Sequence, residues 1–374
     1  MILVFKKKRA SIKKSNVLSF ITVVLSLIFL FLNNSCRIMN QKDLSPKATF
    51  SFVKNMGMGW NLGNTFDNLV LKEHDYETGW GNPKVTPELI HFLKKQGFKT
   101  IRIPVSWGVR CGPAPSYQIP EKMISRLKEV IQWCMHEDMY VILNMHHESE
   151  WIHAATDDYG TFFQKYSAIW KQIAQNFGEF DERLIFESMN EIGFPKLDVD
   201  SAADLLNKVN AEFVKIIRDS KFEQNKYRFL LLAGLDTDVD KSLGRIHFPD
   251  DSYRCILSIH YYTPSVFTIA EPGTSWGYRS DWGNQEDLEQ LKRQFAKLKT
   301  GFMNNGMPVI LGEFGCLVHS KDSVSRHNYF EAIIKEAVSY GICPIFWDNG
   351  EELDRNNLTW RHPDVDEAFV SIHD

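Results

Sequence analysis

The chain of 374 residues is 44% hydrophobic and 24% charged, with a formal net charge of −4. This composition is that of a globular protein and excludes a disordered chain, while the length suits one or two domains or a single large barrel. Residues 1–35 hold six basic and no acidic side chains, so the remainder carries 37 basic against 47 acidic ones, about −10. This acidic balance argues against nucleic acid as a partner, because phosphate binding needs a basic face.

The first 36 residues are predicted to be an export signal of the lipoprotein type. Basic residues between positions 6 and 14 precede an uncharged, apolar run at 17–32, and "NNSC" follows. This order is typical of secretory signals; the run is at the short end for a spanning helix, so an uncleaved anchor is the alternative. Cys36 resembles the lipidated cysteine of bacterial lipoproteins, although Asn33 stands where an aliphatic residue is usual. We expect export to the bacterial cell envelope or surface, with the membrane contacted only through a lipid anchor at Cys36.

Residues 37–48 are expected to be a linker and residues 49–374 a single domain, because no Pro-, Gly- or Ser-rich stretch interrupts the latter. The cysteines after Cys36 are odd in number and none forms a CxxC pair, which argues against a disulfide framework or a zinc site. Buried free thiols are expected instead. These cysteines are Cys111, Cys134, Cys255, Cys316 and Cys343.

From residue 49 onward, apolar strand-like runs alternate with amphipathic helical segments. Eight runs are predicted to be strands: 57–64, 100–107, 140–147, 183–191, 227–234, 255–264, 308–315 and 343–350. A helix start is predicted at "TPEL", where Thr86 precedes Pro87. One helical face holds Ile124, Leu127, Ile131 and Cys134, and another holds Leu288, Leu291, Phe295, Leu298 and Phe302.

Apolar strands that alternate with helices predict a parallel sheet covered by helices. Eight such units are expected to close into an α/β fold, the (β/α)8 TIM barrel. The competing fold, a doubly wound open sheet, more often has five to seven strands and a glycine-rich phosphate loop after the first. Neither GxGxxG nor GxxxxGK[ST] occurs in the chain.

In such a barrel the reaction site lies where the strands end, at the start of the βα loops. The predicted strand ends carry a concentration of imidazole, carboxylate, amide and indole groups. They are Arg102 on the second strand, His146 and His147 on the third, Asn190 and Glu191 on the fourth, His260, Tyr261 and Tyr262 on the sixth, Glu313 on the seventh, and Trp347 and Asp348 on the eighth.

Glu191 and Glu313 come from opposite sides of the predicted ring and can face each other across its mouth. Two carboxylates at one cleft suit glycosidic bond cleavage, in which one donates a proton to the leaving oxygen and the other attacks the anomeric carbon. Their mutual repulsion and different surroundings are expected to separate their pKa values. Taken singly, each glutamate could equally be a solvated loop acid or an ion-pair partner.

Seven motifs in barrel order, spanning Gly57 to about Gly350, resemble glycoside hydrolase family 5, in particular its bacterial endo-β-1,4-glucanases. They are "GWNLGNTFD", "IRIPVSW", "NMHHE", "ESMNE", "SIHYYTP", "LGEFG" and "FWDNG". Any one of them is weak, but seven in the correct order are specific. The resemblance implies that no cofactor is needed.

The resemblance also implies roles for individual residues. Glu191 matches the general acid/base and Glu313 the nucleophile. Asn190 matches the residue that bonds the substrate 2-hydroxyl. Arg102 matches the arginine beside the nucleophile, where its charge favours the carboxylate form, and Tyr262 matches the tyrosine whose hydroxyl bonds the same carboxylate.

Further matches concern the sugar site. His260 corresponds to the histidine near the acid/base, and His146 to the one that lines the site of cleavage. Trp347 corresponds to its aromatic floor, which suits the apolar C–H faces of a sugar ring. His147 is expected either to contact a neighbouring sugar or to pack, because adjacent residues of a strand point to opposite faces. No H-x-x-x-H spacing supports a metal site.

Three further expectations concern side chains of less certain role. Tyr261 is expected to pack outward. Asn61 and Asn64 are expected either to contact sugar or to stabilise turns, and Asn64 is the favoured sugar contact of the two. Aromatic residues in the βα loops could stack on successive sugars of a long chain, which favours internal cutting, or simply pack. They are Trp80, Trp107, Trp151, Trp276, Tyr278 and Trp282.

The leading hypothesis is a retaining endo-β-1,4-glucanase that acts by double displacement on a β-linked polysaccharide. The same chemistry on xyloglucan, mixed-linkage glucan, xylan or mannan is the alternative within the reaction class. Two alternatives belong to other classes of protein: a surface lipoprotein that binds glycans without cutting them, and a metal-dependent barrel hydrolase. Retention predicts carboxyl groups about 5 to 5.5 Å apart, against about 6.5 to 9.5 Å for inversion.

Overall fold

The computed structural model describes residues 43–70, 75–250 and 252–370; the predicted export signal, with Cys36, lies outside them. Residues 44–374 form one compact unit. Within the described part of the chain, none of the helices combines the length and the apolar character that crossing a bilayer requires.

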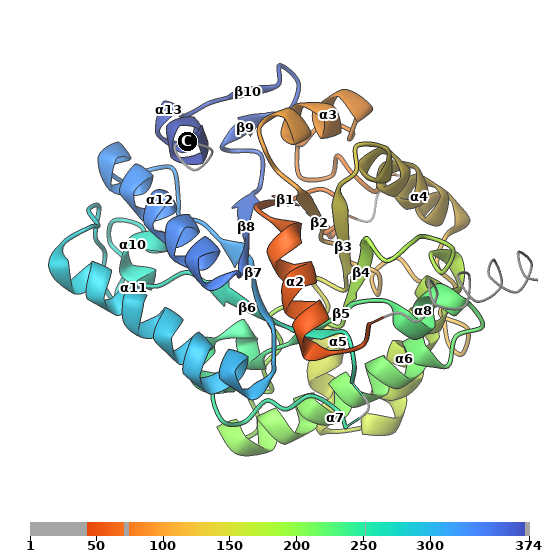
Figure 1. Ribbon diagram of the computed structural model, residues 1–374. Coiled ribbons are helices and arrows are strands. Elements are labelled where there is room, and N and C mark those ends of the chain that lie inside the picture. The colour runs from red at the N-terminus through yellow and green to blue at the C-terminus, as the bar shows by residue number, and fades with distance from the viewer. Residues whose placement is uncertain (1–42, 71–74, 251, 371–374) are drawn as a thin grey trace, which may run out of the picture. The chain divides into compact units, whose positions relative to one another are not determined.

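Eight parallel strands form a closed barrel in chain order, as predicted, and every neighbouring pair is parallel (Figure 1). The strands are β1 (Gly59–Leu62), β2 (Thr100–Ile103), β3 (Tyr140–Asn144), β4 (Leu184–Glu187), β5 (Leu230–Ala233), β6 (Cys255–Tyr261), β7 (Val309–Phe314) and β8 (Cys343–Asp348). Each lies inside a predicted run but is shorter. The predicted runs extend past the last strand residues, so Asn190 and Glu191 belong to the loop after β4 and His146 to the loop after β3.

Helices surround the barrel. The longer ones are α3 (Pro87–Lys95), α4 (Glu121–His136), α6 (Tyr159–Asn176), α7 (Val199–Arg218), α11 (Gln285–Lys297) and α12 (Ser323–Tyr340). Shorter ones are α5 (Ser149–Ile152), α8 (Glu223–Tyr227), α9 (Val239–Ser242), α10 (Ser265–Thr268) and α13 (Pro363–Val370), with the single turns η1 (His153–Thr156), η2 (Leu235–Thr237), η3 (Leu298–Phe302) and η4 (Met303–Asn305). Strands β9 (Leu353–Asp354) and β10 (Thr359–Trp360) form a small hairpin after β8.

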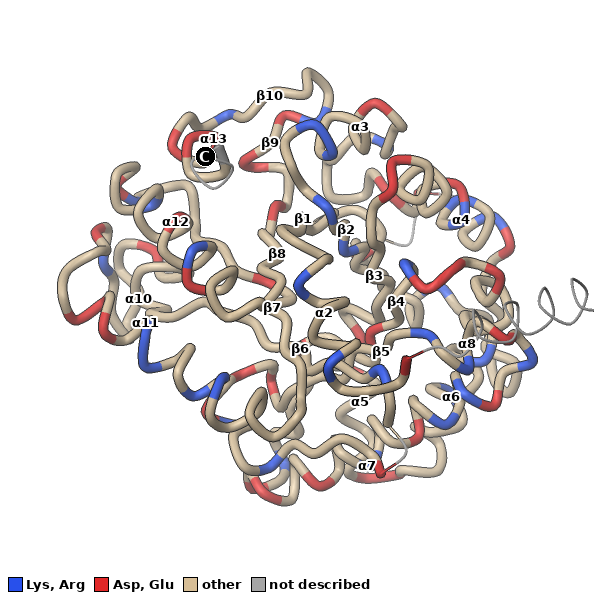
Figure 2. The backbone as a smooth tube through the Cα atoms, viewed as in Figure 1, with Lys and Arg blue, Asp and Glu red and all other residues tan. Residues whose placement is uncertain are grey.

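Sequence signals account for the helix starts and buried faces. The hydroxyl of Thr86 accepts from the Leu89 amide and Pro87 opens α3, as predicted. The predicted apolar face of α4 is buried. The predicted face at α11 and η3 is buried except for Leu288, which is 40% exposed. Figure 2 shows acidic and basic residues interspersed along these outer helices.

One helix precedes the barrel. α2 (Pro46–Met56) begins after Ser45, whose hydroxyl accepts from the Ala48 amide, so it starts inside the stretch 37–48 that was expected to be a linker. Val53 and Met56 of α2 pack against the inward side chains of the strands, and Phe52 stacks on Phe229. The helix therefore closes the end of the barrel where the strands begin (Figure 1), and the opposite end remains for the site.

The cysteines in the described part of the chain are free. Cys134, Cys255 and Cys343 are buried, as expected, whereas Cys111 and Cys316 are only half-buried. Burial raises the pKa of the Cys134 thiol to about 12, so it behaves as an apolar core residue.

Candidate active site

A cleft of about 370 Å³ opens at the carboxyl ends of the strands. Seven of the ten predicted site residues line it: His146, His147, Asn190, Glu191, Tyr262, Glu313 and Trp347. Arg102 and His260 lie buried beneath it and bond its carboxylates. Asn64 is not among the lining residues; its backbone has a φ of 53° and its amide donates to Asp67 in a turn.

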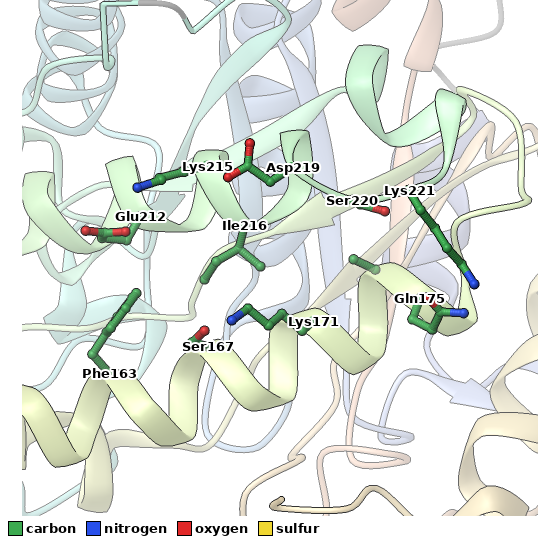
Figure 3. A pocket seen from close by; sticks show the side chains of 11 residues that line it. Phe163, Ser167, Lys171, Gln175, Glu212, Lys215, Ile216, Asp219, Ser220 and Lys221 are labelled. Atoms are coloured by element: carbon green, nitrogen blue, oxygen red, sulfur yellow. The ribbon is translucent and has the colours of Figure 1, made fainter.

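A second hollow of about 430 Å³ lies on the outer surface between α6 and α7 (Figure 3). It is lined by surface lysines, acids and a few apolar side chains, such as Lys171, Glu212 and Ile216. None of the predicted site residues contributes to it. We therefore place the candidate site at the strand ends, where the titratable groups converge.

Arg102 is the centre of the polar network below the cleft and is completely buried. Its Nη1 donates to Glu313 Oε1 at 2.7 Å and to Asn61 Oδ1 at 3.0 Å, and its Nη2 donates to Asn190 Oδ1 at 2.7 Å. Burial alone would lower the pKa of Arg102, but adjacent carboxylates outweigh it and raise that pKa. The guanidinium is therefore a fixed positive charge that holds Glu313 and Asn190 in place.

The two predicted glutamates meet over His260. His260 Nδ1 lies 2.7 Å from Glu191 Oε1 and 3.6 Å from Glu313 Oε2, and a carboxylate oxygen of each glutamate lies within 4.8 Å of the other. The two carboxylates therefore lie close together at the mouth of the barrel. The side chain of Glu191 is 46% exposed and that of Glu313 is 6% exposed.

The surroundings separate the pKa values of the two glutamates, but in the order opposite to the one that the predicted roles need. Burial and the nearby Glu191 raise the pKa of Glu313, although His260 and Arg102 oppose this. Burial would raise the pKa of Glu191 too, but the hydrogen bond and charge of His260 lower it. Burial lowers and the two carboxylates raise the pKa of His260, and the net shift is upward. In the unliganded site, His260 Nδ1 is thus within hydrogen-bond distance of Glu191 and acts on Glu313 through its charge.

Glu191 also has an unusual backbone. Its φ of 41° lies in the left-handed region, which costs free energy for a residue with a side chain. The conformation directs the carboxylate back over the barrel mouth toward His260. Tyr262, from the loop after β6, donates its hydroxyl to Glu313 Oε2 at 3.0 Å.

Trp347 and His146 form the wall of the cleft next to these acids. Their rings are stacked, with centroids 5.6 Å apart and planes inclined by 6°. Burial, with the nearby charge of Arg102, lowers the pKa of His146 well below its ordinary value, so His146 is neutral. Its Nδ1 lies 3.0 Å from the amide of Asn144, which fixes the ring. The expectation that His146 and His147 point to opposite faces is wrong: their ring centroids are 4.4 Å apart and both residues line the cleft, because β3 ends at Asn144 and the strand alternation ends with it. The ring of His147 also contacts that of Trp80.

The remaining aromatic predictions divide by exposure. Trp107 and Trp282 are buried packing residues, Trp151 and Tyr278 are half-buried, and Trp80 and Trp276 are 39% and 54% exposed. Tyr261 is buried against Phe295 of α11, which agrees with outward packing.

Several polar residues of the network were missed from the sequence. Glu187 is fully buried on β4 and bonds Arg102 and Ser258. Its only signal was a charge inside an otherwise apolar strand. Asp67 accepts two backbone amides below His147, and burial raises its pKa to about 6.

Two groups of side chains in the described residues bring three possible metal-ligand atoms within 4.8 Å of one another: Asp67, His146 and His147, and Glu191, His260 and Glu313. In the second group, His260 Nδ1 already lies at hydrogen-bond distance from Glu191. In the first, His146 is fixed by Asn144 and Asp67 by backbone amides. Hydrogen bonding therefore accounts for both arrangements.

The buried ion pair of Glu352, in the loop after β8, with Arg326 offers a stability test. Burial raises the pKa of Glu352 to about 8. The charge of Arg326, whose Nη2 lies 2.5 Å from Glu352 Oε1, opposes this rise. This pKa is above that of a glutamate in the unfolded chain, about 4.3, so protonated Glu352 stabilises the folded state at low pH. That contribution to the free energy of unfolding is lost as the pH rises from about 4.3 through 8, at up to about 1.4 kcal/mol per pH unit. We expect Glu352→Gln to flatten the fall in urea unfolding free energy between pH 5 and 8.

The matched control for that measurement is Glu179→Gln, an exposed glutamate in the turn before β4. It should follow the wild-type curve. Parallel curves for Glu352→Gln and wild type would contradict the prediction.

Comparisons with known proteins agree with this geometry. The cellulase family model, glycosyl hydrolase family 5, matches residues 63–353. Endoglucanase A of Paenibacillus barcinonensis is 35% identical over 82% of this chain and 84% of its own length. The cellulase/esterase CelE of Acetivibrio thermocellus is 33% identical over 90% of this chain, which spans 42% of that longer protein. A GH5-4 broad specificity endoglucanase from Clostridium acetobutylicum has a TM-score of 0.78 and 32% identity, covering 86% of this chain and 99% of its own.

Proposed function

The chain belongs to glycosyl hydrolase family 5 and is an endo-acting β-1,4-glucan hydrolase, and from this premise we propose that Glu313 is its nucleophile and Glu191 its acid/base in a double displacement. The observation that supports Glu313 as the nucleophile is that two side chains donate hydrogen bonds to its carboxylate. Arg102 Nη1 and the Tyr262 hydroxyl both donate to it, and such donors favour the ionised form. Glu191 faces solvent, where a leaving sugar would lie.

In the first step, a Glu313 oxygen bonds to the anomeric carbon as the glycosidic bond breaks, and Glu191 gives its proton to the leaving oxygen. In the second, Glu191 takes a proton from a water that attacks the glycosyl-enzyme, so the configuration at the anomeric carbon is retained. The proton reaches Glu191 when a sugar covers its half-exposed side chain and removes water, because desolvation raises the pKa of a carboxyl group.

Asn190 is proposed to bind the substrate 2-hydroxyl. Its Oδ1 is occupied by Arg102 Nη2, which leaves the NH₂ group as the donor available to the cleft. Trp347 with His146 is proposed as the platform for the sugar at the cleavage site, since a sugar presents an apolar face to an indole. His147 is proposed to serve a neighbouring sugar.

The preferred substrate is proposed to be an unbranched β-1,4-glucan of the cellulose type. The broad specificity described for the Clostridium acetobutylicum endoglucanase keeps xyloglucan, mixed-linkage glucan, xylan and mannan as alternatives. The test is a comparison of initial rates for residues 37–374 on carboxymethyl-cellulose, xyloglucan, mixed-linkage glucan, xylan and mannan. Highest activity on mannan or xylan would overturn the assignment. Activity that survives a chelator is expected, because none of the proposed steps uses a metal.

Trp80 is proposed as a platform for a sugar beyond the cleavage site. It lies on the rim against His147, in a loop fixed by Asn82, whose amide bonds three backbone carbonyls, and by Glu77, which pairs with Arg126. We expect Trp80→Ala to raise the KM for long oligosaccharides about tenfold, the value of one aromatic stacking contact, and to leave kcat on an aryl cellobioside nearly unchanged.

The conservative variant of that residue is Trp80→Phe, which keeps an aromatic face and should change KM much less. An equal KM increase on the short and long substrates would argue against a remote platform. Initial-rate kinetics on a cello-oligosaccharide series decides between these outcomes.

The amino-terminal sequence supports the proposal that the protein is exported and that Cys36 carries a lipid anchor on the cell envelope or surface. Expression of full-length protein with labelled palmitate, followed by fractionation, tests it. Cys36→Ala should lose the label and leave the membrane fraction. Membrane retention without label would point to an uncleaved helix instead.

A further inference from the structure

Glu187 is a buried charge that the steps above do not use. It is the last residue of β4, its side chain is 0% exposed, and it does not line the cleft. Its Oε2 accepts from Arg102 Nε at 2.6 Å and its Oε1 accepts from the Ser258 hydroxyl at 2.7 Å. An ionised carboxylate is costly to bury unless it is paired, and here Arg102 is the partner.

The geometry around Arg102 suggests a function for Glu187. The guanidinium is planar, and each of its edges has a different partner. Arg102 Nε donates to Glu187, while the two terminal nitrogens donate to Glu313 and Asn190. Because Glu187 is itself held by Ser258 on β6, it fixes the plane of the guanidinium and with it the directions of the other two bonds.

We propose that Glu187 is a positioning residue for the hydrolysis: it orients Arg102 so that the nucleophile and the amide that binds the 2-hydroxyl both face the anomeric carbon. The proposal rests on the function assigned to Glu313 and Asn190 above. It differs from that function in naming a group that never touches the sugar.

Charge adds a second consequence. Arg102 is shared between two carboxylates, Glu187 and Glu313, at 2.6 Å and 2.7 Å. Removal of the charge on Glu187 would leave the positive field of Arg102 to act mainly on Glu313 and would lower the pKa of Glu313. The titratable groups that face Glu313 are Arg102 from β2, Glu191 from the loop after β4, His260 from β6 and Tyr262 from the loop after β6.

Two variants separate these effects. Glu187→Gln keeps an acceptor for Arg102 Nε and removes the charge, so the acid limb of the kcat profile should move to lower pH while KM is unchanged. Glu187→Ala removes the orienting bond, so kcat should fall about a hundredfold with little change in KM, the size expected for a supporting contact. Ser258→Ala, which loosens Glu187, should give a smaller loss of kcat in the same direction.

The measurement is kcat and KM from pH 4 to 9 on an aryl cellobioside, normalised to the folded fraction from circular dichroism. If Glu187→Ala does not fold, Glu187→Gln and Ser258→Ala still decide the matter. An unmoved acid limb in Glu187→Gln together with full kcat in Ser258→Ala would overturn the proposal and indicate a structural role. Failure of the assigned function is seen separately, as hydrolysis that persists in Glu313→Gln.

Discussion

Glu313→Gln is expected to abolish hydrolysis while binding of the glucan survives. The amide cannot form the glycosyl-enzyme, so the loss of kcat should reach about 10⁴-fold to 10⁶-fold, as for other enzymes that lose a covalent nucleophile. Gln keeps an oxygen that can accept from Arg102 Nη1, so the walls of the cleft should stay in place. Reducing-end release from carboxymethyl-cellulose measures the first effect, and calorimetry with a cello-oligosaccharide measures the second.

This variant also separates the enzyme from a lipoprotein that only binds glycans. Such a binder would show no hydrolysis in the wild type, and the substitution would change nothing but affinity. Glu179→Gln, an exposed glutamate before β4, is the control and should keep full activity. A Glu313→Gln protein that still releases sugars would show that the nucleophile has been misassigned.

The barrel could be predicted from the sequence because its evidence is local and repetitive. Apolar runs between amphipathic helices specify buried parallel strands whatever the loops contain. The strand ends could not be placed as well, because the side chains of Ser188, Met189 and Asn190 stay buried after β4 ends at Glu187. The location of Glu191 and Glu313 at one mouth followed from the topology, since every strand of such a barrel ends on the same side.

The network under the cleft could not be predicted because it joins residues far apart in the chain. Glu187 and Arg102 are 85 residues apart and meet only because β2 and β4 flank β3 in a closed ring. The order of the two glutamate pKa values could not be predicted from the sequence either. It depends on His260, whose ring lies between both carboxylates, and on how much water reaches each of them.

Glu191→Ala is expected to slow hydrolysis of a glucan by about 10²-fold to 10⁴-fold, since the leaving sugar then departs without a proton. A dinitrophenyl cellobioside should behave differently, because its leaving group needs no proton. Glu313 can still attack it, and without a base the glycosyl-enzyme accumulates. Stopped-flow absorbance should therefore show a burst of one dinitrophenolate per active site followed by a slow steady state.

Azide should accelerate that steady state and yield a glycosyl azide of retained configuration. The anion has room to enter where the half-exposed carboxylate is removed, and it attacks without a general base. The unliganded pKa directions, upward for Glu313 and downward for Glu191, would by themselves suit the reverse assignment of roles. Under that assignment, the glycosyl azide of retained configuration would come from Glu313→Ala, and Glu191→Ala would give an azide of inverted configuration by direct displacement. We expect the azide of retained configuration from Glu191→Ala, because Arg102 and Tyr262 both donate hydrogen bonds to Glu313. A carboxyl group that accepts two such bonds is held in its ionised form, which suits a nucleophile better than a proton donor.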